Sequence, residues 1–291
     1  RQRQMCIRDS LWNSFVSWLG RNRSRRPLNG VVLVVSLVNL LNQSPSERKE
    51  LAGILRTRLI ELSRELGTRP PLYVVLSKFD LLEGFETLFA RLPKSAREDI
   101  FGFTFTLDSL RDYDAWLDEL VERYDAFLKR LNEQVFDAMA NAGERTQRES
   151  LYSLVRQMSG LRPVLLDFLG DVLGSDRFAT PALPRGVFFS SVYQQGLLNN
   201  TFVASAARTY ALREPNNKVH PSGQALVYFA QQLFQRVIYP ESGLAGDNPR
   251  VLKQKKYALA LHFGVASLGS LLVIGGWYHY YGCLLYTSPS P

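Results

Sequence analysis

The spacing of hydrophobic and polar residues predicts an α/β protein. Residues 28–37 are a continuous apolar run rich in valine, which is typical of a parallel strand covered on both faces. The segment Ser44–Glu47 then provides an N-cap, a proline at the first helical position and a capping box. Apolar residues follow at helical spacing until Gly67, and Leu72–Leu76 is a second buried strand. Strand, helix and strand of these lengths predict a βαβ unit.

The middle of the chain has a helical pattern. Apolar and aromatic residues recur at steps of three and four from Tyr113, and a second such stretch runs from about Arg145 to Gly174. Pro163 should bend or break this second stretch. We therefore expect residues 113–180 to form an all-helical insertion or subdomain, whose aromatic stripe is mainly core.

Two further strands flank this helical segment. Residues 101–106 alternate aromatic and smaller residues, which indicates a short strand or a packed loop, and Val187–Phe189 is a third buried strand. Tyr228–Val237 is expected to be a final amphipathic helix. Residues 11–112 would thus form the first part of an α/β domain, and residues 181–256 its last strand and helices.

Residues 257–282 are expected to be a transmembrane helix. The run from Tyr257 to Tyr281 has no Asp, Glu, Lys or Arg, and it is longer than the about 20 apolar residues that cross a hydrocarbon core. Positively charged flanks stay in the cytoplasm, so residues 11–256 are expected to be cytoplasmic. The flanking cations are Arg250, Lys253, Lys255 and Lys256. A buried helix of a soluble protein is the alternative.

The two ends of the chain are related to each other at the level of DNA. Met5–Ser10 and Cys283–Ser288 can be encoded by strings that are reverse complements over nearly their whole length. Both resemble translated ends of a transposase-based sequencing adapter, so we interpret residues 1–10 and 283–291 as scars. We then expect the natural protein to continue in both directions. A natural inverted repeat is the alternative.

The composition offers little material for a catalytic or metal site. Between the two interpreted scars there is no cysteine, and the whole chain has three histidines, so we expect neither catalytic residues nor metal ligands. The net charge is +8, from 35 basic and 27 acidic residues, without one nucleic-acid-type patch. A nucleic-acid partner is therefore not expected. The clearest basic clusters lie at residues 21–26 and 250–256.

Five residues are candidates for recognition of a nucleotide base. Ser77, Lys78 and Asp80 follow the second strand with the spacing of the Asn/Thr-Lys-x-Asp motif of GTPases, in which the carboxylate accepts hydrogen bonds from guanine. Ser190 and Ser191 follow the third strand, where GTPase-like folds place a small-residue loop at the base. Ligands of open α/β sheets bind beyond the carboxyl ends of the strands. The alternative is that Asp80 caps the next helix and Lys78 is a solvated loop residue.

The sequence has no phosphate loop of the form G-x-x-x-x-G-K-S/T. Asp171-Val-Leu-Gly174 has the letters of the magnesium-sensing D-x-x-G string of GTPases, but it follows the Ser-Lys-Phe-Asp element, which is the wrong order. We therefore interpret it as a helix C-terminus. This stretch of chain by itself supports no cofactor.

Five segments resemble the cytoplasmic region of the IcmF/TssM family and occur in the family's order. They are RRPLNGVVLVVSLVNLL, PLYVVLSKFDLLEGF, FGFTFTLD, RGVFFSSVYQQG and YFAQQLFQRVIYPESGLAG. The resemblance implies a partial P-loop-NTPase-like (GTPase-like) parallel sheet with a helical insertion, followed by one transmembrane helix that leads to a periplasmic domain. Some family members carry an upstream phosphate loop, so ATP or GTP with magnesium is implied only for the full-length protein.

The resemblance also implies a place in a secretion machine. Members of this family are inner-membrane scaffolds of type VI secretion systems, which contact the TssL (DotU-like) subunit, baseplate components and, through a periplasmic part, the TssJ lipoprotein. We therefore expect a structural scaffold of a hetero-oligomeric complex in the bacterial inner membrane. The alternative is a membrane-anchored ATPase or GTPase whose nucleotide hydrolysis drives or regulates assembly. A type IVB system relative also remains open.

Overall fold

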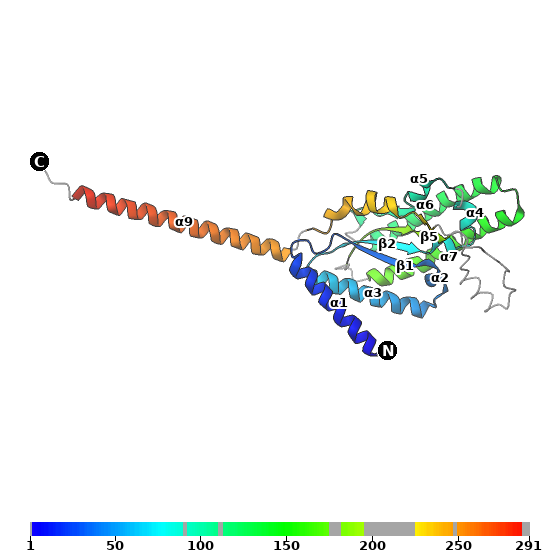
Figure 1. Cartoon of the computed structure of the whole chain (residues 1–291), viewed down its shortest axis with the longest axis horizontal. Helices are drawn as coiled ribbons and strands as arrows, with labels where there is room; N and C mark the ends of the chain where they lie inside the picture. The colour runs from blue at the N-terminus through cyan, green and yellow to red at the C-terminus, as the bar shows by residue number, and fades with distance from the viewer. Residues whose placement is uncertain are drawn as a thin grey trace. The chain divides into compact units, whose positions relative to one another are not determined.

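The computed structural model describes residues 2–89, 92–109, 113–174, 182–194, 225–246 and 249–286. The chain divides into two compact units. Figure 1 shows the helices and strands of both. The α/β unit contains Leu28–Glu65 and Arg69–Gly246, and the helical unit contains Arg1–Pro27, Leu66–Thr68 and Asp247–Pro291. Residues 175–180 of the expected helical segment and residues 287–291 of the second interpreted scar lie outside the described residues.

Three parallel strands and one antiparallel strand form the main sheet. β1 (Val31–Ser36), β2 (Pro71–Ser77) and β4 (Leu183–Phe189) are parallel, and β3 (Gly102–Thr104) pairs antiparallel with β4. The strand order is β1-β2-β4-β3. α3 (Pro45–Leu66) connects β1 to β2, so the predicted βαβ unit is confirmed. β3 confirms the short aromatic strand.

The helix α3 begins and ends where the sequence predicts. The Ser44 N–H donates to Glu47 Oε2 at 2.8 Å and the Glu47 N–H donates to Ser44 Oγ at 3.3 Å, which is the predicted capping box. The backbone and side-chain hydrogen bonds from Ser44 lower the pKa of the Glu47 carboxyl. Gly67 has a left-handed φ of +65°, which ends the helix.

β2 is covered on both of its faces. Its residues from Pro71 to Leu76 are all buried. Leu72, Val74 and Leu76 belong to the large core cluster of the α/β unit. The alternate residues Tyr73 and Val75 belong to a second cluster on the other face. The other buried members of that cluster are Phe188, Leu233 and Val237.

β1 is an edge strand, and the expectation that it is covered on both faces is wrong. Val32 and Val34 are 36% and 61% exposed. They pair with Tyr73 and Val75 of β2, and so they lie on the face of the second cluster. The helical cover of that face, η3 (Leu233–Ile238), packs on β2 and β4. The face of β1 next to it therefore stays open.

Two long helices, α6 (Tyr113–Ala140) and α7 (Arg145–Leu173), confirm the helical middle of the chain. Their buried residues belong to the same core cluster as β2, so the pair packs against the sheet. α7 continues through Pro163, and the predicted break is not found. Leu161 and Leu165, two residues to either side, are fully buried, and this packing offsets the hydrogen bond that proline cannot donate.

The chain after β4 differs from the expectation. β5 (Ser191–Gln194) and β6 (Ala225–Tyr228) form a two-stranded antiparallel sheet, so Tyr228 ends a strand instead of beginning a helix. Phe229 follows with a left-handed φ of +61°. Helical structure begins at residue 231 and continues through η3 to η4 (Pro240–Gly243). The remaining short helices are α2 (Leu37–Asn42), η1 (Phe79–Leu81), α4 (Phe85–Phe89) and α5 (Lys94–Glu98).

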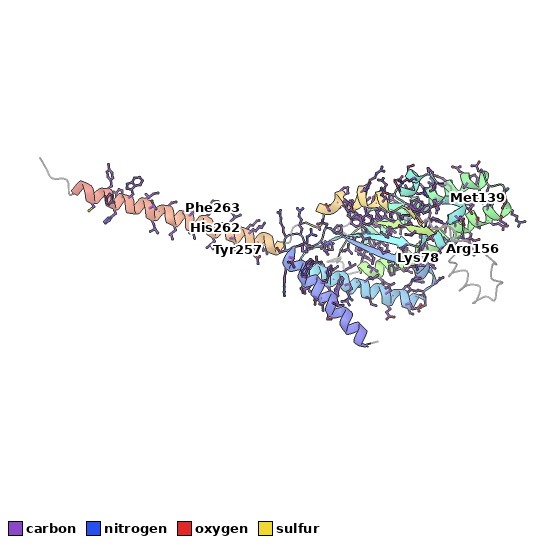
Figure 2. The ribbon with its side chains drawn as sticks, viewed as in Figure 1. Lys78, Met139, Arg156, Tyr257, His262 and Phe263 are labelled. Atoms are coloured by element: carbon purple, nitrogen blue, oxygen red, sulfur yellow. The ribbon has the colours of Figure 1, made fainter. Side chains whose placement is uncertain are left out.

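The helical unit contains α1 (Gln2–Asn22) and α9 (Pro249–Tyr286). Within α9, Lys253–Cys283 is long and apolar enough to cross a membrane. Its most apolar 18-residue window has a mean hydropathy of 1.9, and none of the residues in that window is buried. Figure 2 shows Tyr257 and Phe263 projecting from this helix. The basic flank that the sequence places before the membrane segment forms the first turns of the same helix. The interpretation of both chain ends as scars remains a prediction.

A buried ion pair joins β4 to η4. Arg185 is 7% exposed, and its Nε and Nη2 donate to the two carboxylate oxygens of Glu241 at 2.9 and 2.6 Å. Its Nη1 donates to the Phe105 carbonyl at 2.8 Å, and the Tyr73 hydroxyl donates to Glu241 at 2.9 Å. Burial alone raises the pKa of Glu241, but the hydrogen bonds from Arg185 and Tyr73 outweigh it, so this pKa lies below its usual value. Two strands, the loop after β3 and η4 are thus connected through the Arg185–Glu241 pair.

We predict that Glu241→Gln destabilises the fold. The substitution leaves the Arg185 guanidinium buried without its counter-charge, so the free energy of unfolding at pH 7 should fall by about 3 kcal/mol. Because the pKa of Glu241 is lowered on folding, the wild-type pair should keep its stabilising effect above the unfolded pKa of about 4.3 and lose it as the pH falls further. Chemical denaturation of the detergent-solubilised chain, followed by circular dichroism, measures both effects.

Asp125→Asn is the matched control. Arg162 donates to both oxygens of Asp125, at 2.6 and 2.9 Å, but the two side chains are 35% and 51% exposed. An exposed pair of the same geometry contributes less than about 1 kcal/mol. Equal losses in the two variants would contradict the role assigned to the buried pair.

Candidate functional site

The five residues proposed for base recognition come together at the carboxyl ends of β2 and β4. These strands are parallel neighbours, with Leu76 opposite Phe189. The Ser190 N–H donates to the Leu76 carbonyl at 2.9 Å, and the Phe79 N–H donates to the Ser190 carbonyl at 3.5 Å. The two loops that carry the candidate residues are therefore hydrogen-bonded to each other. We call Ser77, Lys78, Asp80, Ser190 and Ser191 the strand-end cluster.

Asp80 and Ser191 form a reciprocal hydrogen-bonded pair at the centre of this cluster. The Ser191 hydroxyl donates to Asp80 Oδ1, and the Asp80 N–H donates to Ser191 Oγ at 3.2 Å. Burial raises the pKa of Asp80, against the opposing effects of the Ser191 hydrogen bond and the Lys78 charge. The carboxylate thus bonds to a residue 111 positions away in the chain, and it does not act as the cap of the next helix.

The other members of the cluster have different surroundings. The Ser77 hydroxyl donates to the Val35 carbonyl of β1 at 3.3 Å, and the Ser190 hydroxyl donates to the Tyr228 carbonyl of β6 at 3.1 Å. Lys78 is exposed, as the solvated-loop alternative expects, and has a left-handed φ of +63° (labelled in Figure 2). The serine hydroxyls therefore join β1, β2, β4 and β6.

Phe79, the variable position of the Ser-Lys-x-Asp string, anchors the loop to the core. It is fully buried, and its ring centroid lies 5.4 to 5.7 Å from those of four other phenylalanines. These are Phe85, Phe89, Phe101 and Phe189. Sequence reasoning did not identify this role, although a phenylalanine between two charged residues after a buried strand is a signal for it.

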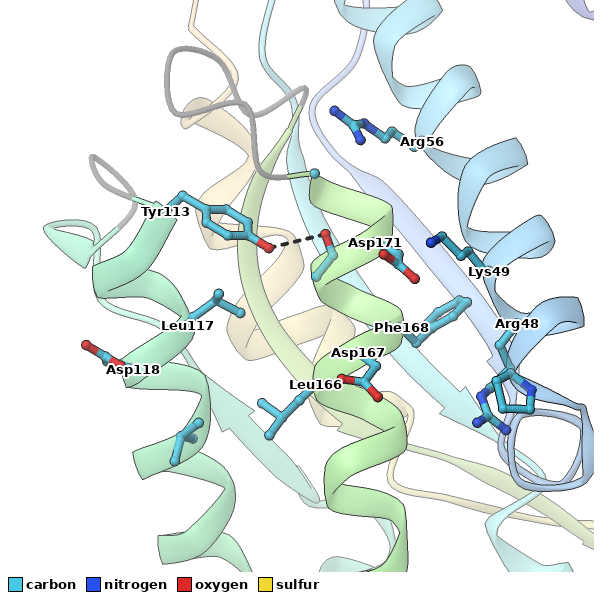
Figure 3. A pocket seen from close by; sticks show the side chains of 14 residues that line it. Arg48, Lys49, Arg56, Tyr113, Leu117, Asp118, Leu166, Asp167, Phe168 and Asp171 are labelled. Atoms are coloured by element: carbon cyan, nitrogen blue, oxygen red, sulfur yellow. Dashed lines mark hydrogen bonds between the residues drawn. The ribbon is translucent and has the colours of Figure 1, made fainter.

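A separate charged cavity of about 630 Å³ lies between α3, α6 and α7 (Figure 3). Its cationic wall carries Arg48, Lys49 and Arg56 of α3, and Asp167 and Asp171 of α7 lie opposite. Because its walls carry both signs of charge, the cavity does not offer the uniformly positive lining that favours a polyphosphate. Sequence reasoning missed it, because its residues come from three helices that share no motif.

The end of α7 lines this cavity and contains the Asp171–Gly174 string. The Tyr113 hydroxyl of α6 donates to the Gly170 carbonyl at 3.3 Å. Burial raises the pKa of Tyr113, and Asp171 and Asp114 add to the effect. Gly174 has a φ of +73° and ends the helix, as the sequence predicts. Asp171 is a helical surface residue of the cavity.

The described residues contain no group of three or more His, Cys, Asp or Glu side chains that could hold a metal ion. In the membrane-compatible helix, His262 Nδ1 lies 2.7 Å from the Ala258 carbonyl, one turn earlier, so this ring bonds within its own helix. The strand-end cluster offers one exposed cation and one carboxylate that is already hydrogen-bonded. That arrangement connects the loops after β2 and β4 through hydrogen bonds.

We predict that Asp80→Asn preserves the fold and removes one source of pH dependence. The amide oxygen can still accept from Ser191. The raised pKa of Asp80 means that the folded state binds more protons than the unfolded state above pH about 3.9. Wild-type stability should therefore decline as the pH rises from there through the folded pKa, whereas the amide of the Asp80→Asn variant should contribute no such decline. The free energy of unfolding, measured across this pH range, tests the difference.

Ser191→Ala is the companion variant. It removes a hydrogen bond that lowers the pKa of Asp80. The decline in the free energy of unfolding should therefore extend to higher pH. A full wild-type decline in Asp80→Asn would mean that another group causes it.

Comparison with known proteins assigns the family. A family model described as the IcmF-related N-terminal domain matches residues 8–266. The chain is 31% identical over 263 residues to the type VI secretion system component TssM1 of Pseudomonas aeruginosa PAO1. The match covers 90% of this chain and 24% of that protein, so the chain spans about a quarter of the relative's length. No solved structure matches the chain. The match over most of its length shows that the chain belongs to the IcmF-related, or IcmF/TssM, family.

Proposed function

We propose that this chain is the cytoplasmic region, with the adjoining membrane helix, of a scaffold subunit of the type VI secretion membrane complex. The observation that carries the proposal is the 31% identity to TssM1 over 90% of the chain. α9 supports attachment to a membrane, because it contains a span of sufficient length and hydropathy.

The distribution of charge along α9 supports an orientation in the bacterial inner membrane. Lys253, Lys255 and Lys256 lie at the amino end of the span, and Trp277 and Tyr281 lie near the other end. Lys and Arg are retained on the cytoplasmic side, and aromatic rings favour the interface. We therefore place residues 11–256 in the cytoplasm and residues 257–282 in the membrane.

The α/β unit is proposed to be a partial P-loop-NTPase-like (GTPase-like) fold that serves for protein contacts. The parallel order of β1, β2 and β4 supports this fold, as does a base-motif-like cluster at the strand ends. α6 and α7, within the expected range 113–180, are proposed to be its helical insertion. In this proposal the strand-end cluster connects the loops after β2 and β4, because the Ser191 hydroxyl already donates a hydrogen bond to the Asp80 carboxylate.

The partners follow from the family resemblance. The cytoplasmic region would contact a TssL-like (DotU-like) membrane subunit and baseplate components, within a hetero-oligomeric complex. A periplasmic region of the full-length protein would engage a TssJ-like lipoprotein. The open apolar face of β1, with Val34 61% exposed, supports a role in protein contacts.

The second candidate function is a membrane-anchored ATPase or GTPase. The observation that favours it is the grouping of Lys78 and Asp80 with Ser190 and Ser191 at the carboxyl ends of β2 and β4. Open α/β sheets bind ligands beyond these strand ends. Phosphoryl transfer also needs a phosphate loop and a magnesium ion. These would have to come from a part of the full-length protein outside the present sequence.

We predict that Asp80→Asn in the full-length protein changes guanine-nucleotide affinity by less than about twofold, as measured by isothermal titration with GDP and magnesium. A carboxylate that reads guanine contributes hydrogen bonds of about 1.5–3 kcal/mol, so its loss would weaken binding by about 10- to 100-fold. Asp80→Asn suits the test because Ser191 keeps an acceptor.

The same preparation tests the scaffold role. The TssL-like subunit should co-purify with the wild type and with Asp80→Asn in equal amounts. Failure of the subunit to co-purify with either protein would overturn the scaffold proposal. A loss of nucleotide affinity of the larger size would show that Asp80 binds the base and would favour the second candidate function.

The proposed orientation of α9 predicts the outcome of a cysteine-labelling experiment. In a background with Cys6→Ser and Cys283→Ser, a cysteine at exposed Glu133 should react with a membrane-impermeant maleimide only after spheroplasts are permeabilised. Cys283, restored as the single cysteine, lies beyond the proposed span; it is the control and should react without permeabilisation. Labelling of position 133 in intact spheroplasts would contradict the proposed cytoplasmic location.

A further inference from the structure

α1 has an unusually apolar exposed face. Leu11, Phe15 and Trp18 are 64%, 51% and 57% exposed. Their spacing of four and three residues places them on one side of the helix. Val16 and Leu19 lie on another side and are only 2% and 6% exposed. The helix is therefore packed along one side and presents a stripe of large apolar side chains, which we call the α1 stripe, on the other.

A cluster of arginines follows the α1 stripe directly. Arg21 lies in the last turn of α1. Three more arginines follow directly after the helix: Arg23, Arg25 and Arg26. Residues 22–26 line a cavity of about 400 Å³ on the surface. Guanidinium groups bind phosphate through two parallel hydrogen bonds, so this cluster suits a phosphate headgroup.

The helical unit also contains the membrane-compatible helix. α1, the arginine cluster and α9 all belong to it. α9 contributes Lys253, Lys255 and Lys256 at the start of its candidate span. Both basic clusters of the chain thus belong to the unit with a helix able to cross a bilayer. An anionic membrane surface attracts each such cation by about 1 kcal/mol.

We propose that α1 is an interfacial membrane helix that binds the anionic headgroups of the cytoplasmic leaflet. The α1 stripe lies at the boundary between headgroups and acyl chains, and Arg21, Arg23, Arg25 and Arg26 contact lipid phosphates. An exposed Trp, Phe and Leu stripe beside clustered arginines is the chemistry of such helices. A lipid surface fits better than a protein groove, because four arginines directly follow the apolar stripe and a candidate span belongs to the same unit. The proposal rests on the proposed function in requiring that α9 is inserted.

The experiment compares two positions on α1 in the whole chain. Nitroxide labels are placed at Phe15→Cys, on the stripe, or at Ser17→Cys, an exposed polar position of the same helix, in the Cys6→Ser/Cys283→Ser background. The chain is reconstituted in vesicles of phosphatidylcholine with phosphatidylglycerol. Accessibility to oxygen, which concentrates in acyl chains, is compared with accessibility to a water-soluble nickel chelate. A third label at Leu268→Cys reports whether α9 is inserted.

The label at position 15 should show an oxygen-to-nickel accessibility ratio at least about threefold above that at position 17, as expected for a helix lying 5–10 Å deep in the interface. Replacing the four arginines by glutamine should remove most of this difference, as should vesicles of phosphatidylcholine alone. Leu11→Cys repeats the measurement at a second position of the stripe.

Three outcomes are distinguishable. If position 268 is lipid-accessible and position 15 reacts freely with the nickel chelate, the interfacial role of α1 is wrong while membrane insertion stands. If position 15 is shielded from both reagents, the stripe is a protein contact, which also overturns the proposal. If position 268 itself is in water, the proposed membrane function fails before α1 is tested.

Discussion

The structure of the α/β unit depends on covering both faces of β2. Every residue from Pro71 to Leu76 is buried, so this strand needs a partner on each edge and a layer of side chains above and below. β1 and β4 occupy the edges, α6 and α7 supply one layer and η3 supplies the other. The parallel pairing then brings the carboxyl ends of β2 and β4 together, which places the loops after them in contact. The strand-end cluster is therefore a consequence of the way β2 is buried.

The parts of this fold that the sequence predicts are those with local signals. The valine run of β1, the capping box at Ser44 and the glycine at position 67 each act within a few residues, and they define the βαβ unit. The predictions that are wrong concern residues whose structure depends on contacts with distant parts of the chain. The exposed face of β1 depends on where η3 packs, and Tyr228 becomes a strand residue because it pairs with Ser191 across a long connection. Amphipathic spacing alone cannot distinguish these outcomes.

The candidate site shows the same division. Ligands of open α/β sheets bind beyond the carboxyl ends of the strands, and on this basis the sequence groups Lys78 and Asp80 with Ser190 and Ser191. The structure shows that the two loops that carry them are hydrogen-bonded to each other. The sequence did not predict that Ser191 satisfies Asp80, since a hydrogen bond between residues 111 positions apart leaves no mark in either local sequence. The Arg185–Glu241 pair was missed for the same reason, because a single arginine in a strand and a single glutamate after a proline carry no motif.

Several polar groups inside the α/β unit are hydrogen-bonded to other parts of the same chain. Glu241 has three donors from Arg185 and Tyr73, and the Ser77 and Ser190 hydroxyls donate to backbone carbonyls. A buried polar atom that lacks a hydrogen-bond partner is costly. Among the described residues of the α/β unit, Gln43 Oε1, Arg97 Nε and Trp116 Nε1 are such atoms. Large apolar side chains are exposed on the outside, in the valines of β1, the α1 stripe and α9. In the proposed scaffold function, these exposed apolar faces would contact partner proteins and the membrane.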